Sequence, residues 1–189
     1  MDANNIDVGN IILRTQKKFL SAFANRKTLG PILDDDANKL LTSAYHLLRE
    51  VFGRKEAQKM TTRWIKILVK ITFLVNANEL NGEEIKKLDE VQSEFGTTVK
   101  VILSFWEIEF TFESSHLQEK LKKMENLLAS IVNNHMTEKN KSKLKMLFNL
   151  ISQEEFLTNI FTCGKNSKLG LAMIEFTDNL KSLANNNKF

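Results

Sequence analysis

Helix-breaking residues are scarce in this chain, and this scarcity constrains the fold more than any other feature of the sequence. The 189 residues include one proline and seven glycines. Helices tolerate these two residue types least, and the rest of the composition is rich in Leu, Lys, Glu, Phe and Asn, so long helices are favoured over a turn-rich β fold. A chain of this length can also bury a sizeable core. We therefore expect an all-α protein with a single domain.

Capping signals divide the chain into helices. The side chains that can accept hydrogen bonds at helix starts are those of Asp34, Asp35, Asp36 and Thr137, and of two capping boxes, Asn81 with Glu84 and Ser152 with Glu155. Gly53 is expected to end a helix. The predicted helices span residues 8–27, 36–52, 55–77, 82–109, 112–135, 138–150, 153–161 and 166–185. Their short connections indicate an antiparallel bundle of six or seven main helices.

The bundle is predicted to carry an accessory N-terminal helix. Residues 1–29 form an amphipathic helix and its connection, residues 30–185 the bundle, and residues 186–189 a polar tail. Cys163 is the only cysteine, so no internal disulfide can form, which suits a reducing compartment such as the cytoplasm. The N-terminus is too polar for a signal peptide, and no apolar run approaches the roughly 20 residues of a membrane span. Any membrane contact is therefore expected to come from the folded surface.

The centre of the chain carries a specific run of residues. Residues 103–113 read Leu-Ser-Phe-Trp-Glu-Ile-Glu-Phe-Thr-Phe-Glu. This run resembles the Leu-Ser-Phe-x-Glu-(Val/Ile)-(Asp/Glu)-Phe-Thr-Phe-Glu run of the tumor necrosis factor alpha-induced protein 8 family, also called the TIPE family. Weaker matches are Ile65-Lys66 and Val69-Lys70, where that family repeats hydrophobic–lysine pairs, and residues 135–139 with the later Phe148. The resemblance extends from about Leu13 to Ala184.

The resemblance implies a hollow helical bundle with a central hydrophobic cavity. Proteins of that family bind phosphoinositides and move them between membranes, which feeds phosphoinositide signalling, cell survival and directed migration. By their positions in the matched helices, the candidate cavity-lining residues are Ile71, Leu74, Leu103, Phe110, Leu128 and Phe148. A packed core would have much the same composition, so the sequence leaves a hollow and a solid interior open.

Residues 108–112 of the same run alternate between apolar and polar side chains, unlike the helical pattern expected for most of the chain. Ile108, Phe110 and Phe112 alternate with polar residues, and this pattern alone is typical of a β-strand as much as of a helix end. The resemblance implies a junction between two helices instead, with Thr111 as a candidate cap. We therefore expect a junction here.

A basic stripe follows the helix predicted over residues 55–77. Lys59, Arg63, Lys66 and Lys70 are spaced by four, three and four residues, which places them on one narrow side of a helix. Such a stripe is often no more than a solvated face. Several ammonium and guanidinium groups can also converge on phosphate oxygens, so the stripe is a candidate lipid headgroup site.

The predicted N-terminal helix is amphipathic. Its apolar residues group on one side and its polar residues, Arg14, Lys17, Lys18 and Ser21, on the other. This pattern suits an anionic membrane surface, and it equally suits a first helix that packs on the bundle. Lys17 and Lys18 resemble the lysine pair that the TIPE family uses for phosphoinositide contact and membrane engagement. We take Arg14, Lys17 and Lys18 as candidate membrane-contact residues.

The sequence departs from the family pattern near the expected mouth of the cavity. Where family members carry basic residues, this chain has Asn76, Gln92 and Glu94. These departures bear directly on the choice of headgroup.

Catalysis and nucleic-acid binding have little support. Glu113 and His116 match half of a di-iron signature, but no second Glu-x-x-His pair exists in the sequence. No metal site, catalytic residue or cofactor is expected. The lysines between Lys120 and Lys145 lack interleaved aromatic residues and any nucleic-acid motif.

The sequence thus predicts a non-enzymatic phosphoinositide-binding and transfer protein. Its ligand is a phosphoinositide or another anionic phospholipid, with acyl chains inside the bundle and the headgroup at a basic mouth. We expect it in the cytoplasm, peripherally associated with the plasma membrane and open to signalling partners. The alternative is a helical adaptor with a solid core that regulates apoptosis or signalling by binding proteins through its N-terminal helix.

Overall fold

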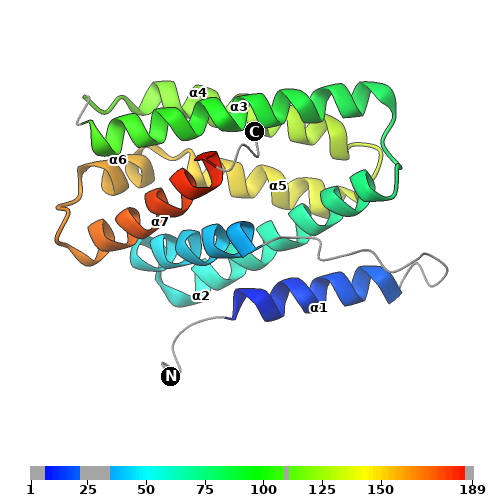
Figure 1. Cartoon of the computed structure of the whole chain (residues 1–189), viewed down its shortest axis with the longest axis horizontal. Helices are drawn as coiled ribbons and strands as arrows, with labels where there is room; N and C mark the ends of the chain where they lie inside the picture. Colours follow the sequence, from blue (N-terminus) through cyan, green and yellow to red (C-terminus); the bar gives the residue numbers. More distant parts are fainter. Residues whose placement is uncertain (1–6, 22–34, 109–110, 186–189) are drawn as a thin grey trace.

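A computed structural model describes residues 7–21, 35–108 and 111–185, without the side chains of residues 16–21. These residues form seven helices and no strand (Figure 1), so the all-α prediction is confirmed. The helices are α1 (Val8–Ser21), α2 (Asp35–Asn76), α3 (Gly82–Glu107), α4 (Ser114–Val132), α5 (Glu138–Ile151), α6 (Glu154–Thr162) and α7 (Lys168–Asn185). The residues predicted to extend the first helix to 27, and the polar tail at 186–189, lie outside the described part of the chain.

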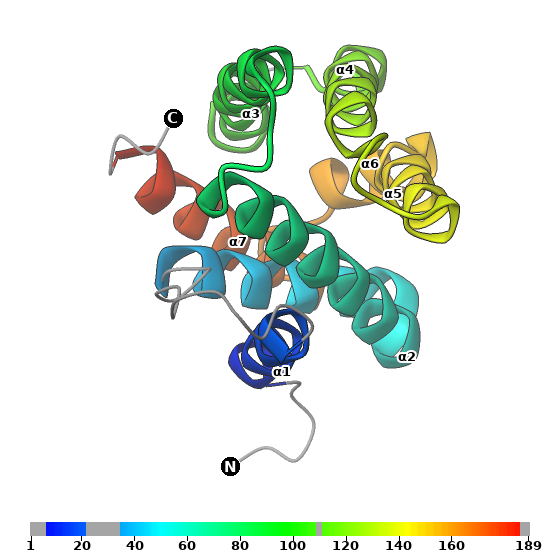
Figure 2. The same cartoon turned by 90° about the vertical axis from the view of Figure 1, so that its right-hand side faces the viewer.

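The helices α2 to α7 are arranged around a common axis when the molecule is seen end-on (Figure 2). α3 and α4 lie side by side, and α5 and α6 follow α4 around the bundle. α7 packs on α2. α1 lies along the outer side of α2, away from α3 and α4, so it packs on the outside of the bundle and is not one of the bundle helices.

α2 contains a break at Gly53. The sequence predicts two helices over 36–52 and 55–77, and the structure joins them into one element whose direction changes at this glycine. Gly53 has φ 76° and ψ 164°, a conformation that is almost restricted to glycine. Apart from the adjoining backbone, no atom lies within 4 Å of the place where a Cβ would be, so the backbone conformation itself requires the glycine.

One predicted capping box is confirmed and the other is wrong. Asn81 Oδ1 accepts a hydrogen bond from the backbone N–H of Glu84 at 2.9 Å, and Glu84 Oε2 accepts one from the backbone N–H of Asn81 at 2.9 Å. Ser152 instead donates to the carbonyl oxygen of Phe148 at 2.7 Å, and Gln153 is the residue that precedes α6. The Ser152 hydroxyl turns back onto the preceding helix, and this local hydrogen bond competes with capping of the next helix.

Two further cap predictions are corrected. Thr137 does precede α5, but its side chain makes no capping hydrogen bond. The residue that precedes α4 is Glu113 rather than Thr111, and it makes none either.

The specific run at residues 103–113 builds one end of the bundle. α3 ends at Glu107, and the described part of the following segment forms no strand, so the helix-to-helix junction is confirmed. Phe112 returns to the bundle, where its ring stacks on Phe161 of α6 at 4.6 Å between centroids and meets the edge of Phe105 at 5.3 Å. Phe112 therefore packs inward while Ile108 is exposed, although both would lie on the same face of a strand.

The described residues form one main apolar cluster and two small ones. The main cluster draws buried residues from α2 and from α3 to α7. A small cluster joins Val8 and Ile12 of α1 to Ile65 and Val69 of α2. α1 is thus held on α2 by its own apolar contacts, separate from those of the bundle interior.

Candidate lipid and anion site

The basic stripe predicted on α2 is present, and its members have different surroundings. Lys59 Nζ lies 3.2 Å from Glu56 Oε2 one turn earlier, so its charge is balanced locally. Arg63 Nη1 donates to the sulfur of Met146 on α5 at 3.1 Å. Lys66 is exposed. The stripe therefore reaches toward α5 at Arg63 and faces solvent at Lys66.

Lys70, at the end of the stripe, is partly buried. Burial lowers the pKa of its ammonium group from the ordinary value, and the carboxylate of Glu79 opposes this shift. Its Nζ lies 5.8 Å from the centre of the Phe73 ring, within range of a cation–π interaction. Lys70 is thus more closely packed than Lys66.

Two lysines of α5 join Arg63 and Lys66. The pKa of Lys143 lies below its ordinary value, mainly because the ammonium group is partly buried and further because Lys139, Lys66 and Arg63 lie near it. We call these four residues the α2–α5 basic cluster. The sequence alone does not indicate that Lys139 and Lys143 belong to this cluster, because nothing local to α5 shows that it packs beside the basic stripe of α2.

The candidate residues of α1 are described in part. Arg14 is exposed, on the side of the helix opposite the buried Ile12. Leu13 is also exposed, at 54%. Lys17 and Lys18 belong to α1, and their side chains lie outside the described part of the structure.

The candidate cavity-lining residues fall into different places. Ile71, Leu128 and Phe148 are buried together in the main cluster, where Phe148 meets the edge of the Trp64 ring at 5.3 Å between centroids. Leu74 belongs instead to a small cluster with Leu80 and Ile131. Leu103 is partly exposed, and Phe110 lies outside the described residues. Three of the six candidates therefore share one apolar interior.

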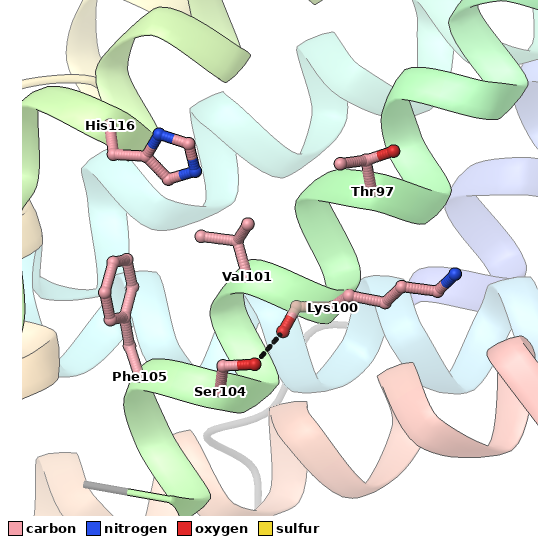
Figure 3. A pocket seen from close by; sticks show the side chains of 6 residues that line it. All are labelled: Thr97, Lys100, Val101, Ser104, Phe105 and His116. Carbon is pink, nitrogen blue, oxygen red and sulfur yellow. Dashed lines mark hydrogen bonds between the residues drawn. The ribbon is translucent and has the colours of Figure 1, made fainter. Parts of the chain in front are cut away.

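A pocket of about 270 Å³ lies between α3 and the start of α4. It is lined by Thr97, Lys100, Val101, Ser104, Phe105 and His116, none of them a predicted lining residue. Figure 3 shows Val101 and Phe105 near His116, while the Lys100 ammonium group points away from them. The pocket is therefore a small apolar hollow with one imidazole rather than a site with converging cations.

Glu94, one of the three departures, is buried and paired. Its Oε2 lies 2.6 Å from Lys123 Nζ and its Oε1 lies 2.9 Å from Lys120 Nζ, and both lysines come from α4. Burial alone would raise the pKa of this carboxyl, but the two ammonium groups outweigh burial and the net shift is downward. We call Glu94, Lys120 and Lys123 the Glu94 network. The other two departures, Asn76 and Gln92, are exposed.

Neither a metal centre nor a membrane span is found in the part of the chain that the structure describes. No three His, Cys, Asp or Glu side chains gather there in a way that could hold a metal ion. No helix of that part is both long enough and apolar enough to cross a membrane.

Comparison with known proteins identifies the family. The sequence profile of the family described as Tumor necrosis factor alpha-induced protein 8-like matches residues 6–187. The chain belongs to this family. The resemblance carried by residues 103–113 is thereby confirmed, and in this member of the family those residues close one end of the bundle through Phe105 and Phe112.

Proteins similar to this chain are found in several animals. Tumor necrosis factor, alpha-induced protein 8-like protein 2 B of Danio rerio is 32% identical over 153 residues, which cover 80% of this chain and 82% of the relative. Protein salivary glands marred of Drosophila melanogaster is 33% identical over 156 residues, which cover 82% of this chain and 81% of the relative.

A solved structure supports the fold. The C-terminal region of G-protein interacting protein 1 from Dictyostelium discoideum superposes with a TM-score of 0.66 at 13% sequence identity, covering 81% of this chain and 93% of that one. At this identity the likeness concerns the helical fold alone.

Proposed function

We propose that the protein binds phosphoinositides or other anionic phospholipids and transfers or presents them without covalent chemistry. The acyl chains occupy the apolar interior between α2 and α4 to α7, and the headgroup is held by basic residues at its edge. The bound phospholipid is a ligand rather than a cofactor. Membership of the tumor necrosis factor alpha-induced protein 8 family supports this role in outline.

The observation that carries the proposal is the arrangement of the second half of α2. Buried Ile67 and Ile71 belong to the main apolar cluster, while Lys66 and Lys70, each next to one of them in sequence, belong to the basic stripe. One helix therefore supplies both apolar side chains to the interior and cations to its edge. A phospholipid requires this combination, because its acyl chains and its phosphates have opposite solvation preferences.

The proposed setting follows from the same residues. A protein that exchanges phosphoinositides acts at the cytoplasmic surface of a membrane, and we place it in the cytoplasm with peripheral attachment to the plasma membrane. Arg14, with Lys17 and Lys18, would add about 1 kcal/mol of attraction per residue near an anionic surface. Signalling proteins, rather than nucleic acid, are the expected macromolecular partners.

The direct test is mass spectrometry of lipid extracted from the purified, folded protein, followed by transfer of a labelled phosphoinositide between vesicles at increasing salt. Stoichiometric phospholipid and salt-sensitive transfer support the proposal, since salt screens exposed charges. Absence of lipid and of transfer contradicts it and favours the adaptor function, in which the bundle is solid.

The role of α1 is tested separately. The double variant Lys17→Glu, Lys18→Glu reverses two charges on α1. We expect it to lose vesicle binding with little change in melting temperature. Binding that is unaltered by the double substitution would remove α1 from the proposed membrane contact. Arg49→Glu with Lys141→Glu is a control that reverses the same charge at two residues already paired with Glu50 and Glu138, outside the basic stripe.

A further inference from the structure

The α2–α5 basic cluster is held together by the packing of two helices. On α5, Lys139 and Lys143 are four residues apart, and Met146 follows after three more, so all three share one side of the helix. Arg63 of α2 reaches that side, where its Nη1 lies 3.1 Å from the sulfur of Met146. A second contact between the same two helices joins Trp64 of α2 to the buried Phe148 of α5. The two helices that carry the four cations are therefore packed against each other through these side chains.

The cluster has no acidic partner among the described residues. Arg63 donates to a thioether, which is a weak acceptor, and Lys143 donates to the side-chain oxygen of Asn140 at 3.3 Å. The charged groups that act on Lys143 are all cations. The nearby Lys141 differs, because its Nζ is 2.7 Å from Glu138 Oε1. Lys143 thus lies near three other cations, with no acidic group among the described residues to balance the four charges, an arrangement that an anion would stabilise.

The structure points to a lipid headgroup as that anion: we propose that Arg63, Lys66, Lys139 and Lys143 form one site, across α2 and α5, for the phosphomonoester groups of a lipid in a membrane. This inference rests on the proposed function for its class of ligand and adds two residues of α5 to the site. A phosphomonoester carries between one and two negative charges at neutral pH and accepts hydrogen bonds through three oxygens, so it can engage several of these cations at once.

A membrane-bound source of the phosphate is favoured by the apolar neighbour of the cations. Met146 is 48% exposed beside Arg63. An exposed thioether next to basic side chains suits the boundary between headgroups and acyl chains. Exposed aromatic rings that could stack on bases are absent from the cluster, since its neighbour Trp64 packs on Phe148.

The test compares two double variants with the wild-type chain. Lys139→Gln with Lys143→Gln removes the α5 half of the site. Lys86→Gln with Lys145→Gln removes the same charge from exposed positions outside it. Binding is measured to phosphatidylcholine vesicles that contain either a phosphoinositide bisphosphate or phosphatidylserine at equal total charge. We expect the site variant to bind the phosphoinositide vesicles about 20- to 30-fold more weakly, roughly fivefold for each cation lost, and the control variant to lose less than about threefold.

Each result has a definite meaning. Unchanged binding of the site variant, an equal loss in the control variant, or an equal loss on phosphatidylserine vesicles overturns the site while leaving the proposed function standing. A wild-type chain that binds neither kind of vesicle overturns the proposed function itself. Binding of a phosphorylated peptide to the cluster, without binding of vesicles, also overturns the assignment to a lipid. Because the removed cations have no acidic partner, we expect the site variant to melt no lower than wild type, which excludes misfolding as the cause of any loss.

Discussion

The Glu94 network and the α2–α5 basic cluster both bring lysines across a contact between two helices, but their charge balance differs. In the Glu94 network a buried carboxylate lies between Lys120 and Lys123, within 2.9 Å of both ammonium groups. In the α2–α5 basic cluster Lys143 lies near three other cations, and the described residues offer it the amide oxygen of Asn140. Lysines on neighbouring helices therefore serve two different purposes in one small bundle.

This difference teaches how to separate structural lysines from candidate binding lysines. A lysine paired with a buried carboxylate stabilises the fold and has little capacity left for a ligand. A lysine among other cations contributes repulsion to the folded protein, so its stabilisation has to come from outside the chain. Glu94 makes the contact between α3 and α4 a structural one, whereas Lys143 of α5 lies among cations of α2 and α5.

The largest expected effect comes from removing the carboxylate of the Glu94 network. Glu94→Ala should lower the free energy of unfolding by about 2 kcal/mol, because the hydrogen bond with Lys123 and the ion pair with Lys120 are both lost. Chemical denaturation measures the change. Glu119→Ala, at an exposed position on α4, is the control and should stay within about 0.5 kcal/mol of wild type. A loss no larger than that of the control would show that the network does not stabilise the fold.

Acidification should remove the same contribution without a change in packing. A carboxyl whose pKa is lowered in the folded state stabilises the protein above its unfolded pKa of about 4.3, and this contribution is lost as the pH falls through the folded pKa. We expect the stability of wild type to fall between about pH 5 and pH 3, and that of Glu94→Gln to fall less steeply.

Urea denaturation at several pH values compares the two slopes. Glu84 also has a lowered pKa, caused first by the backbone N–H of Asn81 and then by His135. Glu84 is present in both wild type and Glu94→Gln. The difference between their slopes of stability against pH is therefore caused by Glu94. Parallel slopes would contradict the pairing of Glu94.

A smaller effect is expected from one lysine of the Glu94 network. Lys120 is 24% exposed and lies 2.9 Å from Glu94 Oε1. Lys120→Gln should cost about 1 kcal/mol, because Lys123 remains to pair with the carboxylate. Thermal unfolding at neutral pH is sufficient to measure it. Wild-type stability in this variant would mean that Lys123 alone satisfies Glu94.

The smallest effect, and the opposite sign, is expected in the α2–α5 basic cluster. Lys143→Gln removes a cation that lies near three others, so stability should stay the same or increase by up to about 0.5 kcal/mol. The same thermal measurement applies, at low salt where repulsion is strongest. A loss as large as that of Lys120→Gln would show that Lys143 makes a stabilising contact within the protein and would weaken the case for a ligand there.

The local features of the fold were predictable from neighbouring residues. The Asn81–Glu84 capping box and the break at Gly53 are found where the sequence places them, because each depends on groups within four residues of one another. The prediction at Ser152 was wrong because a serine before a helix can turn to either of two neighbouring helices, and the local sequence does not decide between them. The junction after residue 107 could be predicted only through the family resemblance, since its periodicity equally favours a strand.

By itself, the sequence determined an all-helical chain, its family and the basic stripe along α2, because scarcity of breakers, a specific run and helical periodicity are all properties of adjacent residues. Only the tertiary structure decided that Leu74 lies outside the main apolar cluster and that lysines of α4 pair with Glu94. It also decided that Lys143 lies near Lys139, Lys66 and Arg63. The physical reason is the same in each case. The environment of these side chains depends on which helix faces they meet, and those faces come from residues about 30 to 80 positions away in the chain.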